Sequence, residues 1–152
     1  MQGTERQNEG GRIIRRGDVI RARTNAELLN KLLGKNYKAY MKCRYPVGEG
    51  VAILLHEFDV VTPAGWQNTE SEDGTVVERY CKRDDEKLKS HRGVPWGERR
   101  ILFEKRRAEE CFIFKGVFEL PAPDSEEARA LGVTADRRVW KKTADVFDLD
   151  SI

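Results

Sequence analysis

Trp66, Gln67 and Asn68 are the residues of this chain whose types and spacing suit a chemical task most directly. An indole ring offers a broad stacking surface, and each amide side chain both donates and accepts hydrogen bonds. A ring beside two amides is what recognition of the edge of a nucleobase requires. We expect these residues on a loop that turns at Asp73-Gly74. A second interpretation stays open, in which Trp66 fills the core while the amides cap the turn.

Basic residues are concentrated near the beginning of the chain. Residues 12–44 include ten basic and two acidic residues, whereas residues 119–152 include five basic and eight acidic ones. The whole chain has a net charge of only +2, so the distribution is more informative than the total. This asymmetry is typical of a protein with one surface that faces a polyanion, although a solvated face of mixed charge also produces charge runs.

Residues 37–47 (YKAYMKCRYPV) alternate bulky and basic side chains, which predicts a strand with one basic face. The basic residues of that face are Lys38, Lys42 and Arg44. Aromatic and basic side chains interleaved on a strand suit nucleic acid, because bases stack on rings and phosphates pair with cations. An ordinary solvated strand has the same pattern, so both interpretations remain.

Composition argues against several other kinds of site. Cys43, Cys81 and Cys111 are widely separated and fit no metal-binding spacing, so we expect reduced thiols, no disulfide framework and no metal. The chain has two histidines and no motif that calls for a cofactor. It also has no apolar run long enough for a bilayer and no signal sequence, so a cytoplasmic protein without membrane contact is expected.

A metal-dependent nuclease is the alternative enzyme class. Such a site needs carboxylates and a lysine that converge, and the candidates are Glu57, Asp59, Glu104 and Lys105. Adjacent residues of a strand point to opposite faces, so Glu104 and Lys105 are not expected to converge. A protein-interaction domain with no ligand pocket is the third class.

The elements that must position these residues centre on a hairpin. Residues 99–120 are the most apolar and β-branched stretch, with a charged turn at 105–110. Alternation places the apolar side chains of one face of its second arm at Phe112, Phe114, Phe118 and Leu120. Gly116 interrupts that face, which indicates a bulge, a sharp bend or a close approach by another backbone or a ligand.

Two short helices and several further strands complete the expected domain. Thr24, Glu27 and Gly34 bound one helix with a leucine stripe. Asp124 or Ser125 caps the second helix, and Gly132 ends it. Strands are expected at residues 51–61, 76–83 and 137–149. We predict an α+β fold in which a mostly antiparallel, curved sheet forms a partly closed β-barrel with two short helices. Residues 1–11 should form a flexible tail and residues 12–152 a single domain.

Several short motifs occur in one order: an apolar strand, PAGWQN, a strand that ends in tyrosine, ILFEKR, a turn and FIFKGVF. This succession, over residues 37–120, resembles the SRA-like module at the C-terminus of helicase-containing, modification-dependent restriction proteins. The matching residues are Trp66, Gln67, Asn68, Gly74, Tyr80, Leu102, Phe103, Arg106, Phe114, Gly116 and Val117. The resemblance implies a PUA-like or SRA-like barrel that reads a flipped, modified base in duplex DNA.

The resemblance and the charge pattern together define the candidate nucleic-acid-binding residues: Trp66, Gln67, Asn68, Tyr80, Lys38, Lys42, Arg44 and Arg106. The chain lacks a nuclease half, a helicase motif and a GxxxxGK[ST] phosphate loop. We therefore expect a reader of DNA without catalytic activity of its own, with any cutting or translocation left to a nuclease or helicase partner chain.

Overall fold

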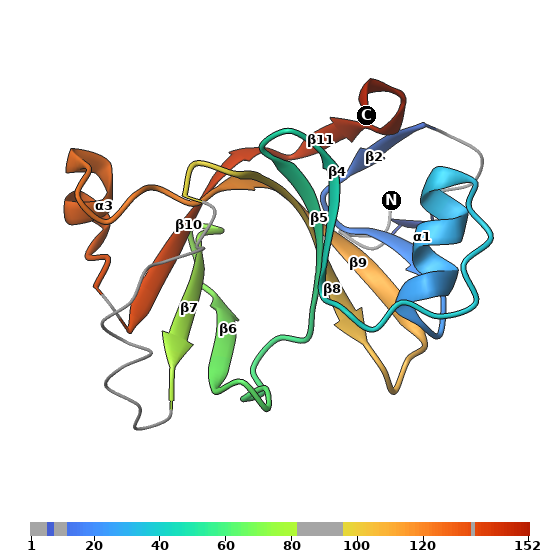
Figure 1. Cartoon of the computed structure of the whole chain (residues 1–152), viewed down its shortest axis with the longest axis horizontal. Coiled ribbons are helices and arrows are strands. Elements are labelled where there is room, and N and C mark those ends of the chain that lie inside the picture. Colours follow the sequence, from blue (N-terminus) through green and yellow to red (C-terminus); the bar gives the residue numbers. More distant parts are fainter. Residues whose placement is uncertain (1–5, 8–11, 82–95, 135) are drawn as a thin grey trace.

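The structure of the chain is a computed structural model, which describes residues 6–7, 12–81, 96–134 and 136–152. Its strands are β1 (Arg6–Gln7), β2 (Ile13–Arg15), β3 (Asp18–Arg21), β4 (Arg44–Gly48), β5 (Val51–His56), β6 (Trp66–Glu70), β7 (Val76–Tyr80), β8 (Arg99–Arg106), β9 (Cys111–Glu119), β10 (Arg137–Ala144) and β11 (Val146–Asp148). Its helices are α1 (Asn25–Leu33), α3 (Glu126–Leu131) and the 3₁₀ helix η1 (Leu149–Ser151). Figure 1 shows a curved sheet with α1 near one end and α3 near the other.

The main sheet has the strand order β4-β5-β8-β9-β10-β7-β6, and β3 pairs with both β9 and β1. All pairs in it are antiparallel except β5 with β8 and β1 with β3. The short strands β2 and β11 form a separate pair. These pairings confirm an α+β fold that is rich in antiparallel strands. Among the described strands the pairing runs from β4 to β6 without closing into a ring.

The β8–β9 hairpin is confirmed as an antiparallel pair, and Phe112, Phe114 and Phe118 are fully buried. The prediction that these three rings share one face is wrong. Phe112 and Phe114 pack with the leucines of α1 in one apolar core, whereas Phe118 and Leu120 pack in a second core around Trp140.

A bulge causes this change of face. Leu102 lies opposite Gly116 but Phe103 lies opposite Phe114, so Lys115 is an extra residue in β9. Because side chains alternate with a period of two, one extra residue moves every later side chain to the other face. Gly116 also has a φ of 122°, so the irregularity expected at this glycine is confirmed.

Both predicted helices are present with their expected ends. The Thr24 hydroxyl accepts a hydrogen bond from the backbone N–H of Glu27, and Gly34 ends α1 in the left-handed conformation. Ser125 and Gly132 bound α3 in the same way. The leucines of α1 face the core, so this helix contributes to the scaffold.

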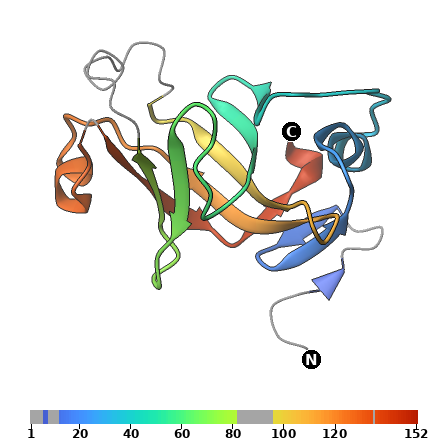
Figure 2. The same ribbon diagram turned by 90° about the horizontal axis from the view of Figure 1, so that it is seen from below.

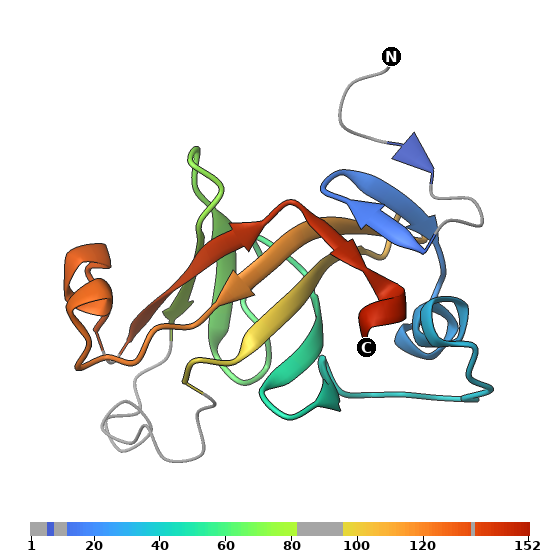
Figure 3. The same ribbon diagram turned by 90° about the horizontal axis from the view of Figure 1, so that it is seen from above.

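Four expected strands have different bounds in the structure. The strand expected at residues 76–83 ends at Tyr80. The predicted strand at residues 37–47 is wrong in its first part, because β4 begins at Arg44. The backbone N–H and C=O of Tyr37 instead bind the side chain of Asn30, which draws this segment toward α1. The strand expected at residues 51–61 ends at His56, before Asp59 with a φ of 64°. The last strand bends after Ala144 and divides into β10 and β11 (Figure 3).

Trp66, Gln67 and Asn68 lie on β6, so the loop expected for them is wrong. They pair with β7 around the predicted turn at Asp73-Gly74, where the Asp73 carboxylate accepts a hydrogen bond from the backbone N–H of Thr75.

Of the tail predicted at residues 1–11, Arg6 and Gln7 form β1, and the remaining residues lie outside the described ones. Most of the charged segment between β7 and β8 also lies outside them, at residues 82–95. The division into a tail and a single domain therefore stays a prediction. No helix in the described ranges is long and apolar enough to cross a membrane.

Candidate functional site

A cavity of about 670 Å³ lies where the end of β5, β6 and β7 meet two loops. Its polar lining includes His56, Trp66, Asn68 and Glu78. The loop between β5 and β6 contributes residues 60–64 to the lining. The backbone N–H of Asp59 donates to the C=O of Asn68, which holds this loop against β6 (Figure 2). The volume is in the range of pockets that bind small ligands or a single base.

Trp66 is positioned by two neighbours. Tyr80 lies opposite it on β7, with ring centroids 5.1 Å apart, and the guanidinium carbon of Arg138 lies 4.2 Å from the centroid of the indole ring. The ring is only half-buried and belongs to neither apolar core. Its place in the pocket lining favours an exposed stacking surface over a core plug.

Two polar side chains of the pocket lining, the half-buried His56 and the buried Asn68, bind each other. The Asn68 amide Nδ2 donates to His56 Nδ1 at 3.2 Å, which leaves the imidazole proton on Nε2. His56 Nε2 and Asn68 Oδ1 are both buried and have no hydrogen-bond partner among the described residues. Burying such a group without a partner costs about 1 to 3 kcal/mol. An unmet donor and an unmet acceptor therefore belong to two residues that line the pocket.

Burial, together with the positive charge of Arg100, lowers the pKa of His56 from 6.5 to about 4. The imidazole is therefore neutral in the folded protein near pH 7. A ligand that contacts His56 therefore contacts a neutral polar group.

The lowered pKa of His56 predicts a loss of stability in mild acid. The unfolded chain binds a proton at this residue below about pH 6.5 and the folded chain only below about pH 4, so stability falls as the pH is lowered between these values. The full difference amounts to roughly 3 kcal/mol. Urea unfolding from pH 7 to pH 4 should show this extra loss in the wild type and not in His56→Gln. Parallel curves for the two proteins would contradict it.

Glu78 is a pocket residue that sequence reasoning missed. It lies opposite Asn68 across the β6–β7 pair, is 8% exposed, and has Oε1 3.4 Å from Nη1 of Arg138. A hairpin centred on Asp73 puts residue 78 opposite residue 68 and residue 80 opposite residue 66. The predicted turn therefore carried a signal that could have identified Glu78.

The structure brings together some of the candidate residues and separates others. Trp66 and Asn68 line the pocket, and Tyr80 supports Trp66. Gln67 points to the other face of β6, because neighbouring residues of a strand alternate.

The basic candidates lie outside the pocket lining. Lys38 and Lys42 are exposed on the irregular segment before β4, and Lys42 adjoins two lining residues, Met41 and Cys43. Arg44 is paired with Glu98, and Arg106 with Glu104.

Three of the four candidates for a nuclease site, all except Asp59, are paired with basic or amide groups. Glu57 binds Arg107, Glu104 lies 3.5 Å from Lys115 Nζ, and Lys105 donates to the Asn25 side chain on the opposite face. The expected divergence of Glu104 and Lys105 is therefore confirmed. Within the described ranges no three His, Cys, Asp or Glu side chains are grouped so that they could hold a metal ion.

Comparison with known proteins places the chain in a family. The model of the SRA (SET and RING associated) domain matches residues 10–149, so the chain belongs to the SRA domain family and the resemblance seen in the sequence is confirmed. A solved structure of the 5-hydroxymethylcytosine-specific restriction enzyme AbaSI matches with a TM-score of 0.58 and 21% identity. That likeness shows the fold; it covers 90% of this chain and 42% of the AbaSI chain. No curated protein sequence matched.

Proposed function

We propose that this chain reads a modified base in duplex DNA by taking the base into the pocket beside Trp66 and Asn68, without catalysis of its own. The observation that carries the proposal is the buried Asn68 Oδ1, which has no partner in the described part of the chain and lies in a pocket next to an aromatic ring. Membership of the SRA family and the fold shared with a 5-hydroxymethylcytosine-specific enzyme support a DNA partner.

The pocket chemistry suits a cytosine derivative. A flipped base needs a ring to stack on and hydrogen bonds along its edge. The exocyclic amine of cytosine is a donor, and Asn68 Oδ1 and the Glu78 carboxylate are acceptors on the same wall of the pocket. Because AbaSI is named for 5-hydroxymethylcytosine, we propose cytosine modified at C5 as the base that is read.

The surroundings of the pocket suit a DNA backbone. Lys105 and Arg107 line the pocket from the β8 side, and Lys42 is exposed nearby. We propose that the curved sheet acts as a partly closed barrel and that this basic rim receives phosphates beside the flipped nucleotide. A nuclease or helicase partner chain in the cytoplasm would then act on the DNA that this chain has read.

The direct test compares two neighbouring amides on β6. Binding of duplexes that carry one cytosine, 5-methylcytosine or 5-hydroxymethylcytosine is measured at fixed salt for the wild type, Asn68→Ala and Gln67→Ala. Asn68→Ala should weaken binding of the modified duplex by about tenfold, because a hydrogen bond to the exocyclic amine of the base is lost. Gln67→Ala is the matched control and should keep the wild-type affinity. Equal binding of all three duplexes by the wild type would exclude the proposed function.

A separate prediction concerns the basic segment before β4. Replacing Lys38 and Lys42 together with glutamate should weaken binding to modified and unmodified duplexes alike and flatten the dependence of affinity on salt, because fewer counterions are released. Arg129→Glu, at the exposed face of α3, is the control. Titrations at four salt concentrations measure the slope. An unchanged slope would remove this segment from the interface.

A further inference from the structure

We propose that a second cavity, of about 650 Å³, binds a phosphate group. It lies along the same face of β6 as the first pocket, because Trp66, Asn68 and Glu70 alternate on that face and Glu70 lines the second cavity. Its basic lining residues are Arg15, Arg16, Arg106 and Lys115, and its acidic lining residues are Glu70 and Asp145. The proposal does not depend on recognition of a base.

Three irregular backbone features meet at this cavity. The first is the β9 bulge at Lys115, a residue that lines the cavity. The second is the turn between β2 and β3, where Gly17 has a φ of 97° and donates its N–H to the C=O of Phe114 on β9. The bend between β10 and β11 is tied to that turn, since the N–H of Arg16 donates to the C=O of Asp145. Bulges often occur beside functional sites, where they redirect a side chain.

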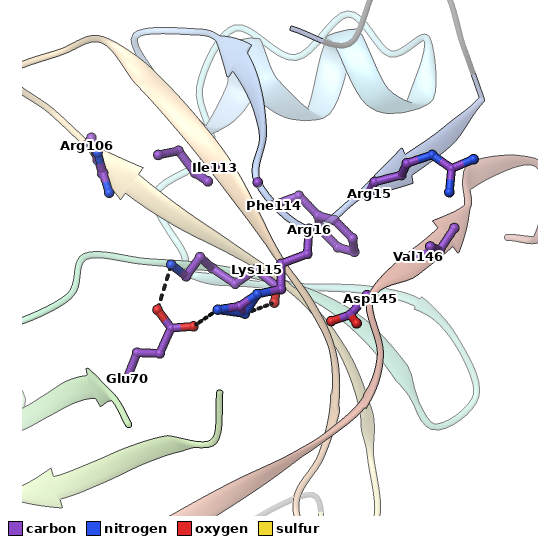
Figure 4. Close-up of a pocket in the computed structure, with 10 residues that line it drawn as sticks. Arg15, Arg16, Glu70, Arg106, Ile113, Phe114, Lys115, Asp145 and Val146 are labelled. Atoms are coloured by element: carbon purple, nitrogen blue, oxygen red, sulfur yellow. Dashed lines mark hydrogen bonds and ion pairs between the residues drawn. The ribbon is translucent and has the colours of Figure 1, made fainter. Parts of the chain in front are cut away.

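The lining of the cavity has more basic than acidic residues. Glu70 lies 2.7 Å from Arg16 Nη2 and 2.8 Å from Lys115 Nζ, two cations that approach from separate segments (Figure 4). Glu104, outside the lining, lies 3.5 Å from Lys115 Nζ as well. Arg106 is balanced from outside the lining by Glu104 and Glu109. The exposed side chain of Arg15 makes no ion pair or hydrogen bond within the described residues. The lining therefore has a positive excess.

A phosphate group fits this arrangement better than a neutral ligand does. Arginine side chains bind phosphate oxygens through two parallel hydrogen bonds, and Arg15 has its donors available. Lys115 is only 13% exposed at its side chain, so its charge is poorly screened by water. Glu70 binds both Arg16 and Lys115, so its carboxylate competes with a phosphate group for these two cations.

The phosphate group that binds in this cavity can come from one of two sources: the DNA backbone, or a free phosphate or nucleotide. Asn68 and Glu70 are two residues apart on one strand, which separates their Cα atoms by about 7 Å. A backbone phosphate near the recognised nucleotide is therefore within reach of the cavity. The experiment has one arm for each source.

The first arm uses inorganic phosphate and NMR with the wild type, Arg15→Gln, Glu70→Gln and the control Arg23→Gln, an exposed arginine of the same basic segment. Phosphate should shift the signals of Gly17 and Lys115 in the wild type and the control. The affinity should fall several-fold in Arg15→Gln, an exposed position that leaves folding intact, and rise in Glu70→Gln, where a competing carboxylate is lost.

The second arm measures the salt dependence of duplex binding for the same proteins. A phosphate of the DNA backbone predicts a slope smaller by about 0.9 in Arg15→Gln, equally for modified and unmodified duplexes. Phosphate shifts with an unchanged DNA slope identify a free anion as the ligand and still support the site. Absence of both effects overturns the proposal. Preference for a modified base, measured in the same titrations, reports on the first pocket alone and separates the two proposals.

Discussion

Replacing Trp66 with alanine should weaken binding of a modified duplex by roughly ten- to a hundredfold while the protein stays folded. Loss of a ring that stacks on a base costs about 1 to 3 kcal/mol, and each factor of ten corresponds to about 1.4 kcal/mol. The effect on folding should be smaller, because Trp66 is half-buried and lies outside both apolar cores. Affinity and melting temperature are measured on the same protein preparation.

Trp66→Phe is the matched control, because it retains an aromatic ring at the same place on β6. It should recover most of the affinity that Trp66→Ala loses. If Trp66→Ala instead melts far below the wild type and binds DNA normally while folded, Trp66 belongs to the scaffold and the pocket beside it is not the reading site.

Gly116→Ala should destabilise the protein by roughly 2 to 4 kcal/mol, through strain and a collision at the β9 bulge. The φ of 122° at Gly116 is a conformation that residues with a side chain rarely adopt. A Cβ atom there would lie 2.9 Å from the carbonyl oxygen of Ala144, which is backbone of the bend into β11. Urea unfolding measures the loss of free energy.

Gly48→Ala in β4 is the control, because a Cβ atom at Gly48 would meet nothing within 4 Å and its backbone needs no positive φ. It should change stability by less than about 1 kcal/mol. Equal stability of Gly116→Ala and the wild type would show that the bulge relaxes easily. The close contact between β9 and Ala144 would then contribute nothing to the free energy of unfolding.

Local signals accounted for the features that were predicted correctly. The ends of α1 depend on Thr24, Glu27 and Gly34, which act within a few residues of each other, and the turn at Asp73-Gly74 is equally local. The β8–β9 hairpin follows from two apolar stretches joined by a short polar turn. Hydrogen bonds between near neighbours determine such elements, so their residues are adjacent in the sequence.

Longer-range contacts decided where the predictions failed. Residues 37–43 have the alternation of a strand, but the Asn30 side chain binds the backbone of Tyr37 and β4 begins only at Arg44. Alternation likewise put Phe114 and Phe118 on one face until a bulge placed them in different cores. A periodic pattern records which side chains prefer burial, and it contains no information about the partner that buries them.

For the candidate site too, some features could be predicted from the sequence and others depended on the tertiary structure. The residue types at Trp66 and Asn68 were enough to suggest stacking and hydrogen bonding to a base, because that chemistry belongs to the side chains themselves. Three features emerged only when distant strands were brought together: the partner His56 on β5, Glu78 across the hairpin, and the separation of Gln67 from the pocket. The second cavity depends still more on tertiary structure: Arg16, Glu70 and Lys115 are far apart in the chain, and a bulge, a turn and a bend are needed for their charges to meet.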